Sequence, residues 1–292
     1  MKKWLDLAWR AIVLYVAFVV LFGVSVNLAT PPGTASMLTP EQAQRSASML
    51  LVVSVLMAGV LIYLTLRARW HGWKLAGALA LIFYGIHTFM SQIETAIFPA
   101  VANRLPPGML RGFFLADLLF AIPFALLLVW VLRKTKAEAG SAQTARLEMP
   151  TGEWIWKLAL IAVLYVLVYW LFGYYVAWRT PGLPEYYGGK DLGFLPGIAV
   201  TMRDTPWLPF FQLLRGLLWA GLGSVIIRMH KGGTFETSLA VGLAFSILAT
   251  APLLLPNPIM GDVVAQAHLR EVGSSNLLFG FLLSLILLWK RK

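Results

Sequence analysis

Apolar residues are gathered into eight long stretches, each bounded by charged or turn-forming residues. A helix needs about 20 mostly apolar residues to cross a bilayer, and a buried β-strand is far shorter. Because lipid offers the backbone no hydrogen-bond partners, we expect each stretch to be a transmembrane helix. The predicted spans are 11–28, 47–66, 75–98, 112–132, 158–178, 207–227, 237–255 and 272–289.

The composition agrees with a membrane protein and excludes several other classes. Of the 292 residues, 59% are hydrophobic and only 13% are charged, whereas about 25% are charged in an ordinary soluble domain. The mean hydropathy is +0.74. The chain has no cysteine, which excludes disulfides, thiolate nucleophiles, zinc–thiolate sites and iron–sulfur clusters. The predicted fold class is therefore all-α, a polytopic membrane helical bundle.

Lysine and arginine are distributed unevenly between the two sides of this bundle. More than twice as many lie on the side that holds both termini, for example in the connections 67–74 and 133–157. The positive-inside rule assigns that side to the cytoplasm. We therefore expect a multi-pass protein of the plasma (inner) membrane with both termini cytoplasmic. Contact with anionic membrane lipids then explains the net charge of +11, and no nucleic acid is expected as a partner.

The two halves of the chain carry matching short motifs in the same order. The motif LFG occurs at 21–23 and 171–173, TP at 30–31 and 180–181, and LR at 110–111 and 269–270. We interpret the matches as a duplicated four-helix unit, with repeats at 1–134 and 154–292 joined by a cytoplasmic linker at 135–153. Four spans return the chain to its starting side, so the two repeats should run in parallel.

Polar and ionisable side chains inside the spans are costly in lipid and usually face the protein interior or an aqueous path. From the helical rise, the ionisable ones are all expected in the outer half of the membrane or at its outer surface. This shared depth predicts one polar site that is reachable from the non-cytoplasmic side. Its expected residues are His87, Ser91, Gln92, Glu94, Asp117, Gln212, Arg215, His268, Glu271 and Asn276.

Several roles are open for these residues. Arg215 could bind a substrate anion or form an ion pair with Asp117 or Glu94. His87, Ser91 and Glu94 share a helix face. His87 and Glu94 are about 10 Å apart along it, which favours steps of a polar or proton path over a shared metal ion. For His87 the alternative is a hydrogen bond between helices. His268 and Glu271 could be solvated groups at a helix start.

Cofactor chemistry is limited by the same positions. Glu94, His268 and Glu271 are at depths that would allow a divalent metal ion to be bound. His87 and His268 differ in depth by roughly half a bilayer, which argues against a bis-histidine haem.

The function that these features favour is a small-solute or ion permease with an outward-facing polar site. The segment 179–206, rich in aromatic residues, proline and glycine, could cover that site. One alternative is a membrane-embedded, metal-assisted enzyme acting on a lipid or lipid-linked substrate. Another is a non-catalytic subunit or assembly factor of a membrane complex, and a membrane-protein partner or a homo-oligomer is compatible with each. The absence of GxxxxGK[ST] excludes a nucleotide-driven motor in this chain.

Overall fold

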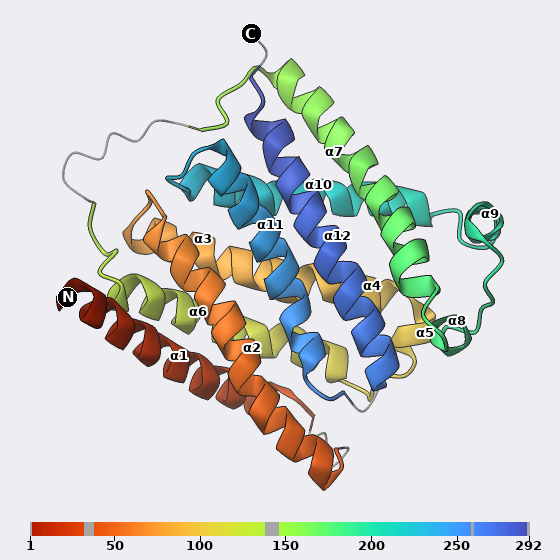
Figure 1. The fold of residues 1–292 in the computed structure, drawn as a ribbon, viewed down its shortest axis with the longest axis horizontal. Helices are drawn as coiled ribbons and strands as arrows, with labels where there is room; N and C mark the ends of the chain where they lie inside the picture. The colour runs from red at the N-terminus through yellow and green to blue at the C-terminus, as the bar shows by residue number, and fades with distance from the viewer. Residues whose placement is uncertain (1, 32–37, 138–145, 258–259, 291–292) are drawn as a thin grey trace.

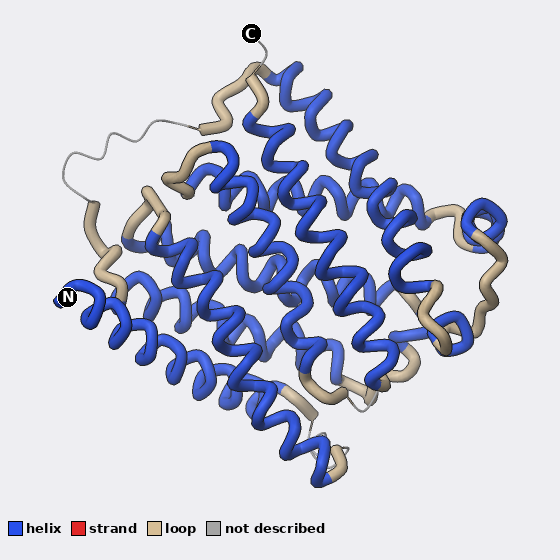
Figure 2. The backbone as a smooth tube through the Cα atoms, in the orientation of Figure 1, coloured by secondary structure: helices blue, strands red, loops and turns tan. Residues whose placement is uncertain are grey.

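The protein is helical throughout the part that the structure describes (Figure 1). This computed structural model describes residues 2–31, 38–137, 146–257 and 260–290. In these ranges no strand occurs, and Figure 2 shows helices joined by loops. Eight helical segments in the described residues are long and apolar enough to cross a membrane. The all-α prediction is confirmed, and the eight segments indicate an integral, multi-pass membrane protein.

Each predicted span corresponds to one of these segments. The first four are α1 (Lys2–Ala29), α2 (Pro40–Leu66), the continuous run of α3 (Gly72–Phe83), η2 (Tyr84–Phe89) and α4 (Met90–Ile97), and α6 (Met109–Val131). The last four are α7 (Thr151–Phe172) with η3 (Gly173–Trp178), α10 (Leu208–Met229), α11 (Thr234–Thr250) with η4 (Ala251–Leu254), and α12 (Asp262–Leu288). The short helices α5 (Pro99–Ala102), α8 (Leu183–Tyr186) and α9 (Phe194–Asp204) lie in connections.

Several helices begin well before the apolar stretch that predicted them. For example, α2 begins at Pro40 rather than at 47, and α12 begins at Asp262 rather than at 272. Hydropathy marks only the part of a helix that needs lipid, whereas a capped helix continues into polar surroundings. At α2 the hydroxyl of Thr39 accepts from the backbone of Gln42 at 3.2 Å, and the side chain of Gln42 accepts from the backbone of Thr39 at 3.0 Å. This capping box, with proline in the first turn, fixes the early start.

The eight spans form a closed ring that is flattened into two layers. In Figure 1, α2, α11, α12 and α7 run side by side in the nearer layer, while α6, α3 and α10 lie behind them. The ring closes because α1 contacts both α2 and α6, and because α7 contacts both α12 and α10. The first four spans meet the last four where α2 contacts α11 and where α3 and η2 contact α10.

Both ends of the described chain lie on one side of the ring, which we call the terminal side. There the Arg10 guanidinium donates to the carbonyl of Val131 at 2.7 Å, joining the start of α1 to the end of α6. The Lys157 ammonium donates to the carbonyls of Leu287 at 3.0 Å and Trp289 at 2.7 Å, joining the start of α7 to the end of α12. The opposite side, where α2 and α12 begin, is called the far side.

The linker between the halves is described only in part, because residues 138–145 lie outside the described ranges. Arg146 follows that gap and donates to the hydroxyl of Thr237 at 2.8 Å and to the carbonyl of Gly232. An antiparallel bridge between Ala68 and His230 also joins the α2–α3 connection to the α10–α11 connection. The terminal side is therefore fastened across the two halves of the chain.

Small residues allow a close contact between α11 and α12 in the second half. A Cβ atom added at Gly280 of α12 would lie only 2.9 Å from the Cα atom of Gly242 in α11. Lipid tails are as apolar as the helix surfaces, so the hydrophobic effect does not drive helices together within the membrane. Close packing of the backbones supplies the attraction instead. Glycine is therefore required at this crossing.

Candidate functional site

Seven of the ten polar residues predicted from sequence fall into three contact groups in the described residues. The His87 group comprises His87, Thr88 and Asp117. The Arg215 group comprises Glu94, Gln212 and Arg215. The His268 group comprises Tyr187, His268 and Glu271.

The His87 group joins the third span to α6 and α11. The Nε2 atom of His87 lies 3.5 Å from Oδ2 of Asp117, and the Thr88 hydroxyl donates to the same oxygen at 2.6 Å. The Nδ1 atom of His87 lies 3.2 Å from the carbonyl oxygen of Leu248. Because a carbonyl can only accept, Nδ1 carries a proton here, and Nε2 carries a second one only when the ring is cationic. The group thus places the imidazole and a hydroxyl against one buried carboxylate oxygen.

His87 and Thr88 lie in a π-helical turn. Residues Tyr84–Phe89 adopt this wider turn in the middle of the third span. Single π-helical turns inside α-helices occur frequently at functional sites, and each changes the angular register of the residues that follow. His87 consequently contacts α6 and α11, whereas Glu94, beyond the turn, contacts α10. The shared helix face predicted from regular spacing does not hold.

The Arg215 group is an ion pair between the two halves of the chain. Arg215 in α10 is 5% exposed, and its Nη2 atom lies 2.8 Å from Oε2 of Glu94 in α4. The same nitrogen donates to the carbonyl of Met90 at 3.1 Å, and Nη1 donates to Oε1 of Gln212 at 3.1 Å. The ring of Tyr165 lies 5.6 Å from the guanidinium carbon. Of the two ion-pair partners considered for Arg215, Glu94 is the one that the structure places there.

Some buried polar atoms around Arg215 have no hydrogen-bond partner among the described residues. In the Arg215 group these atoms are Nε of Arg215 and Nε2 of Gln212, and Oε1 of Gln92 in α4 is likewise buried without a partner among the described residues. A buried donor without an acceptor costs about 1–3 kcal/mol. Glu94 thus occupies only part of the hydrogen-bonding edge of the guanidinium, and unused donors remain beside it.

The His268 group lies on the far side and includes a residue that the sequence prediction did not contain. The Tyr187 hydroxyl lies 2.8 Å from Nε2 of His268, and Nδ1 of His268 lies 3.3 Å from Oε2 of Glu271. Burial raises the pKa of Tyr187, and the negative charges of Glu94 and Glu271 are among the further causes. Tyr187 therefore stays protonated at neutral pH, and its hydroxyl can donate a hydrogen bond to Nε2 of His268. Its only signal in the sequence was its place in the aromatic-rich segment 179–206.

Two expectations about His268 and Glu271 change with the structure. Because α12 begins at Asp262, these residues lie inside the helix and not at its start. Within the described residues, no three His, Asp or Glu side chains form a group that could hold a metal ion. The expected metal set of Glu94, His268 and Glu271 is not assembled, since Glu94 pairs with Arg215 and the other two pair with each other.

Asn276 and Ser91 lie outside the three groups. The Asn276 amide donates to the carbonyl of Phe245 at 3.3 Å, joining α12 to α11. The backbone oxygen of Ser91 accepts from the Thr95 hydroxyl at 3.2 Å. The Asn276 contact is therefore one of helix packing, and the Ser91 contact lies within α4.

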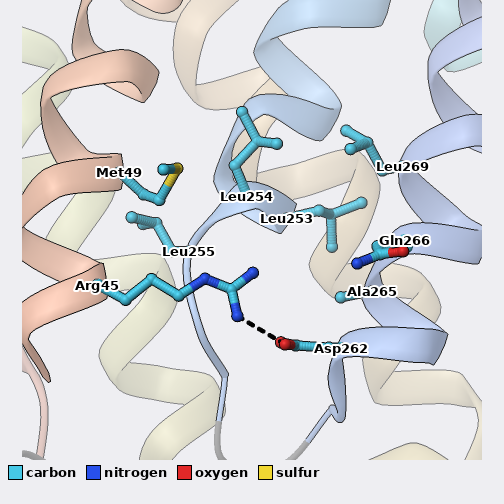
Figure 3. A pocket seen from close by; sticks show the side chains of 9 residues that line it. All are labelled: Arg45, Met49, Leu253, Leu254, Leu255, Asp262, Ala265, Gln266 and Leu269. Carbon is cyan, nitrogen blue, oxygen red and sulfur yellow. Dashed lines mark hydrogen bonds and ion pairs between the residues drawn. The ribbon is translucent and has the colours of Figure 1, made fainter. Parts of the chain in front are cut away.

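A cavity of about 100 Å³ lies apart from these groups, between α2, the 3-10 turn η4 and the start of α12 (Figure 3). Arg45 and Asp262 form an ion pair of 2.6 Å at its polar edge, and Leu253, Leu254 and Leu255 supply an apolar wall. None of the residues predicted for the site lines this cavity.

A fourth polar cluster lies on the terminal side around His230, to which the sequence assigned no role. His230 is fully buried, and its Nδ1 atom accepts from the backbone of Gly232 at 3.1 Å. Burial lowers the pKa of His230 to about 4, so the ring is neutral at physiological pH. Beside it, Arg67 binds Glu236 through two contacts of 2.6 and 2.7 Å. The cluster connects the α2–α3 connection to α11, and its contacts are those of a structural link between the two halves.

Comparison of the chain with protein-family models, with curated proteins and with solved structures finds no match.

Proposed function

We propose that this protein is a permease for a small solute or ion. The observation that carries the proposal is the set of polar contacts between the two halves of the chain at the third span. Glu94 and Met90 bind Arg215 of α10 there, and His87 contacts the backbone of α11.

The cost of these contacts argues against a purely structural role. An ion pair in a low-dielectric interior recovers little more than its desolvation cost, and apolar side chains of similar size often stabilise as well. Ionisable residues inside membrane spans usually mark a substrate or ion pathway. The His87 and Arg215 groups follow one another along the third span, and the His268 group joins Tyr187 to the half of α12 that is nearer the far side. Together they would supply the polar lining of a path that opens on that side.

Two four-helix repeats running in parallel would give this path a pseudo-symmetric boundary. In each half the first span contacts the second and fourth, and the third contacts the fourth. Each half also begins with an acidic–basic pair, Asp6–Arg10 and Glu153–Lys157, whose basic member caps the last span of that half. These parallels support a duplication. Failure of residues 1–134 to superpose on 154–292 about an axis along the membrane normal would contradict it.

The proposed setting is the plasma (inner) membrane, with the terminal side facing the cytoplasm. The cysteine-free chain allows a direct test with single cysteines. Lys190→Cys, in the exposed connection before α9, should react with an impermeant maleimide added to intact cells. Glu148→Cys, in the linker, should react only after permeabilisation. The reverse pattern would invert the topology.

Flux measurements on purified protein in liposomes test the permease proposal. The probes are a carboxylate, inorganic phosphate, a quaternary ammonium ion, a sugar, and Na⁺, K⁺ and H⁺. We expect flux of at least one probe above that of empty liposomes, and a loss of tenfold or more in Arg215→Gln. Lys190→Gln, an exposed residue outside the three groups, is the matched control. No flux of any probe, or equal flux in Arg215→Gln, would contradict the proposal.

The His268 group favours a second candidate, an enzyme embedded in the membrane. A carboxylate, an imidazole and a hydroxyl in series form a geometry that can relay a proton to a bound substrate. A lipid or lipid-linked molecule at the far side would be its substrate. Tyr187→Phe removes the hydroxyl and keeps the ring, so it should abolish turnover of lipid extracts by the purified protein. Unchanged lipid composition with the wild-type protein would exclude this candidate.

A further inference from the structure

We propose that the Arg215 group recognises a small oxyanion, a carboxylate or phosphate, and that the Glu94 carboxylate holds the place of this ligand when it is absent. The inference rests on the permease proposal and names the class of solute that its central site would take.

The geometry of the guanidinium carries the argument. Arginine binds a carboxylate or phosphate best with two parallel N–H donors, commonly Nε together with Nη2. Glu94 contacts Nη2 at 2.8 Å, but Nε has no partner. The resident carboxylate is therefore held by one nitrogen of this edge. A free oxyanion can approach in an orientation that accepts from both Nε and Nη2. Glu94, which is attached to α4, does not reach that orientation here.

Gln212, which contacts Nη1 of Arg215, adds a second set of unused donors beside the guanidinium. Its Oε1 atom accepts from Nη1 of Arg215 at 3.1 Å, which fixes the amide so that Nε2 points away from the guanidinium. That Nε2 atom is buried and has no partner, and the side chain is fully buried. The unused groups on this face of α10 are thus N–H donors. A ligand that satisfies them must present acceptor oxygens.

The charge balance at Arg215 determines whether Glu94 can stay in place when an oxyanion binds. With Glu94 in place the pair is neutral, and a bound monoanion would add an uncompensated negative charge within the membrane span. Glu94 is the more accessible partner, since its side chain is 32% exposed and that of Arg215 is 6% exposed. The carboxylate of Glu94 is accordingly the group that leaves, and it competes with the ligand for Arg215. Removing its charge should strengthen oxyanion binding, whereas a group with a merely structural role would not show this.

The test measures binding to purified protein in nanodiscs at constant ionic strength. Sodium acetate and sodium phosphate are the probes, sodium chloride balances the ionic strength, and the thermal unfolding midpoint reports binding. We expect a saturable rise of the midpoint with at least one oxyanion, and a dissociation constant at least tenfold lower in Glu94→Gln. Glu185→Gln removes a negative charge from exposed α8 on the same side and is the matched control. Its affinity should equal that of the wild type.

Gln212→Met keeps the volume of the side chain and removes the amide donors, so it should weaken binding in the Glu94→Gln background by tenfold or more. Absence of a saturable oxyanion effect in both the wild type and Glu94→Gln would overturn the proposal, as would an unchanged affinity in Glu94→Gln. Oxyanion binding without any flux in liposomes would refute the permease and leave the oxyanion site standing. Flux restricted to cations or neutral solutes, with no oxyanion binding, would refute the oxyanion site and leave the permease proposal standing.

Discussion

The Glu94–Arg215 pair should behave as a thermodynamically coupled unit, and a double-mutant cycle measures the coupling. Arg215→Met keeps the apolar stem and leaves Glu94 charged. Breaking a buried ion pair costs about 3–5 kcal/mol, and we expect about 3 kcal/mol because the Glu94 side chain is 32% exposed and reaches water. Glu94→Gln leaves a buried guanidinium, but the amide oxygen still accepts one hydrogen bond, so about 2 kcal/mol is expected.

The double variant carries neither charge, and its cost should therefore fall below the sum of the two single costs by about 2 kcal/mol. Equilibrium unfolding in mixed micelles, followed by far-ultraviolet circular dichroism at fixed pH, gives the three free energies. Asp117, which was the other partner considered for Arg215, supplies the control cycle with Asp117→Asn, for which we expect additivity. Additive costs within about 0.5 kcal/mol for Arg215 and Glu94 would refute the ion pair as described.

Three further predictions concern stability. Acidification from pH 7 to pH 5 should lower the free energy of unfolding by about 2 kcal/mol through His230. The pKa of His230 is about 4 in the folded state and 6.5 in the unfolded state, so mainly the unfolded state takes up a proton in this range. His230→Gln should flatten this loss in a pH series of unfolding midpoints, and His71→Gln should not. Gly280→Ala should destabilise the protein by about 1–3 kcal/mol in the same unfolding assay, because the added Cβ atom meets the backbone of the neighbouring helix; Gly221→Ala, which meets nothing within 4 Å, should not. Lys157→Met should cost about 2–4 kcal/mol, since it removes the cap of α12, and an unchanged midpoint would contradict that role.

The number and placement of the spans could be predicted from sequence because lipid imposes a length and forbids unpaired backbone. The helix ends could not, since they depend on local capping. Thr39 and Gln42 carry the capping-box pattern, but a hydropathy profile does not register it.

Sequence reasoning could identify costly polar residues but not the contacts between them. The cost of burying charge singled out Glu94 and Arg215, and the structure pairs them. The contact of His87 with Asp117 could not be predicted, because Asp117 lies on another helix and spacing within one helix does not report contacts between helices. The predicted pocket common to all three groups stays a prediction.

The fastening of the two halves at the terminal side limits how they can move. The bridge between Ala68 and His230 and the two-point contact of Arg67 with Glu236 connect the halves at the same end of the bundle. On the far side the exposed Arg45–Asp262 ion pair also connects the halves, but an exposed pair contributes only about 0–1 kcal/mol. Separation of the halves should therefore begin on the far side and pivot about the terminal side. A rocking motion of the two halves would therefore admit water first from the far side. The contacts around His230 would keep the terminal side closed.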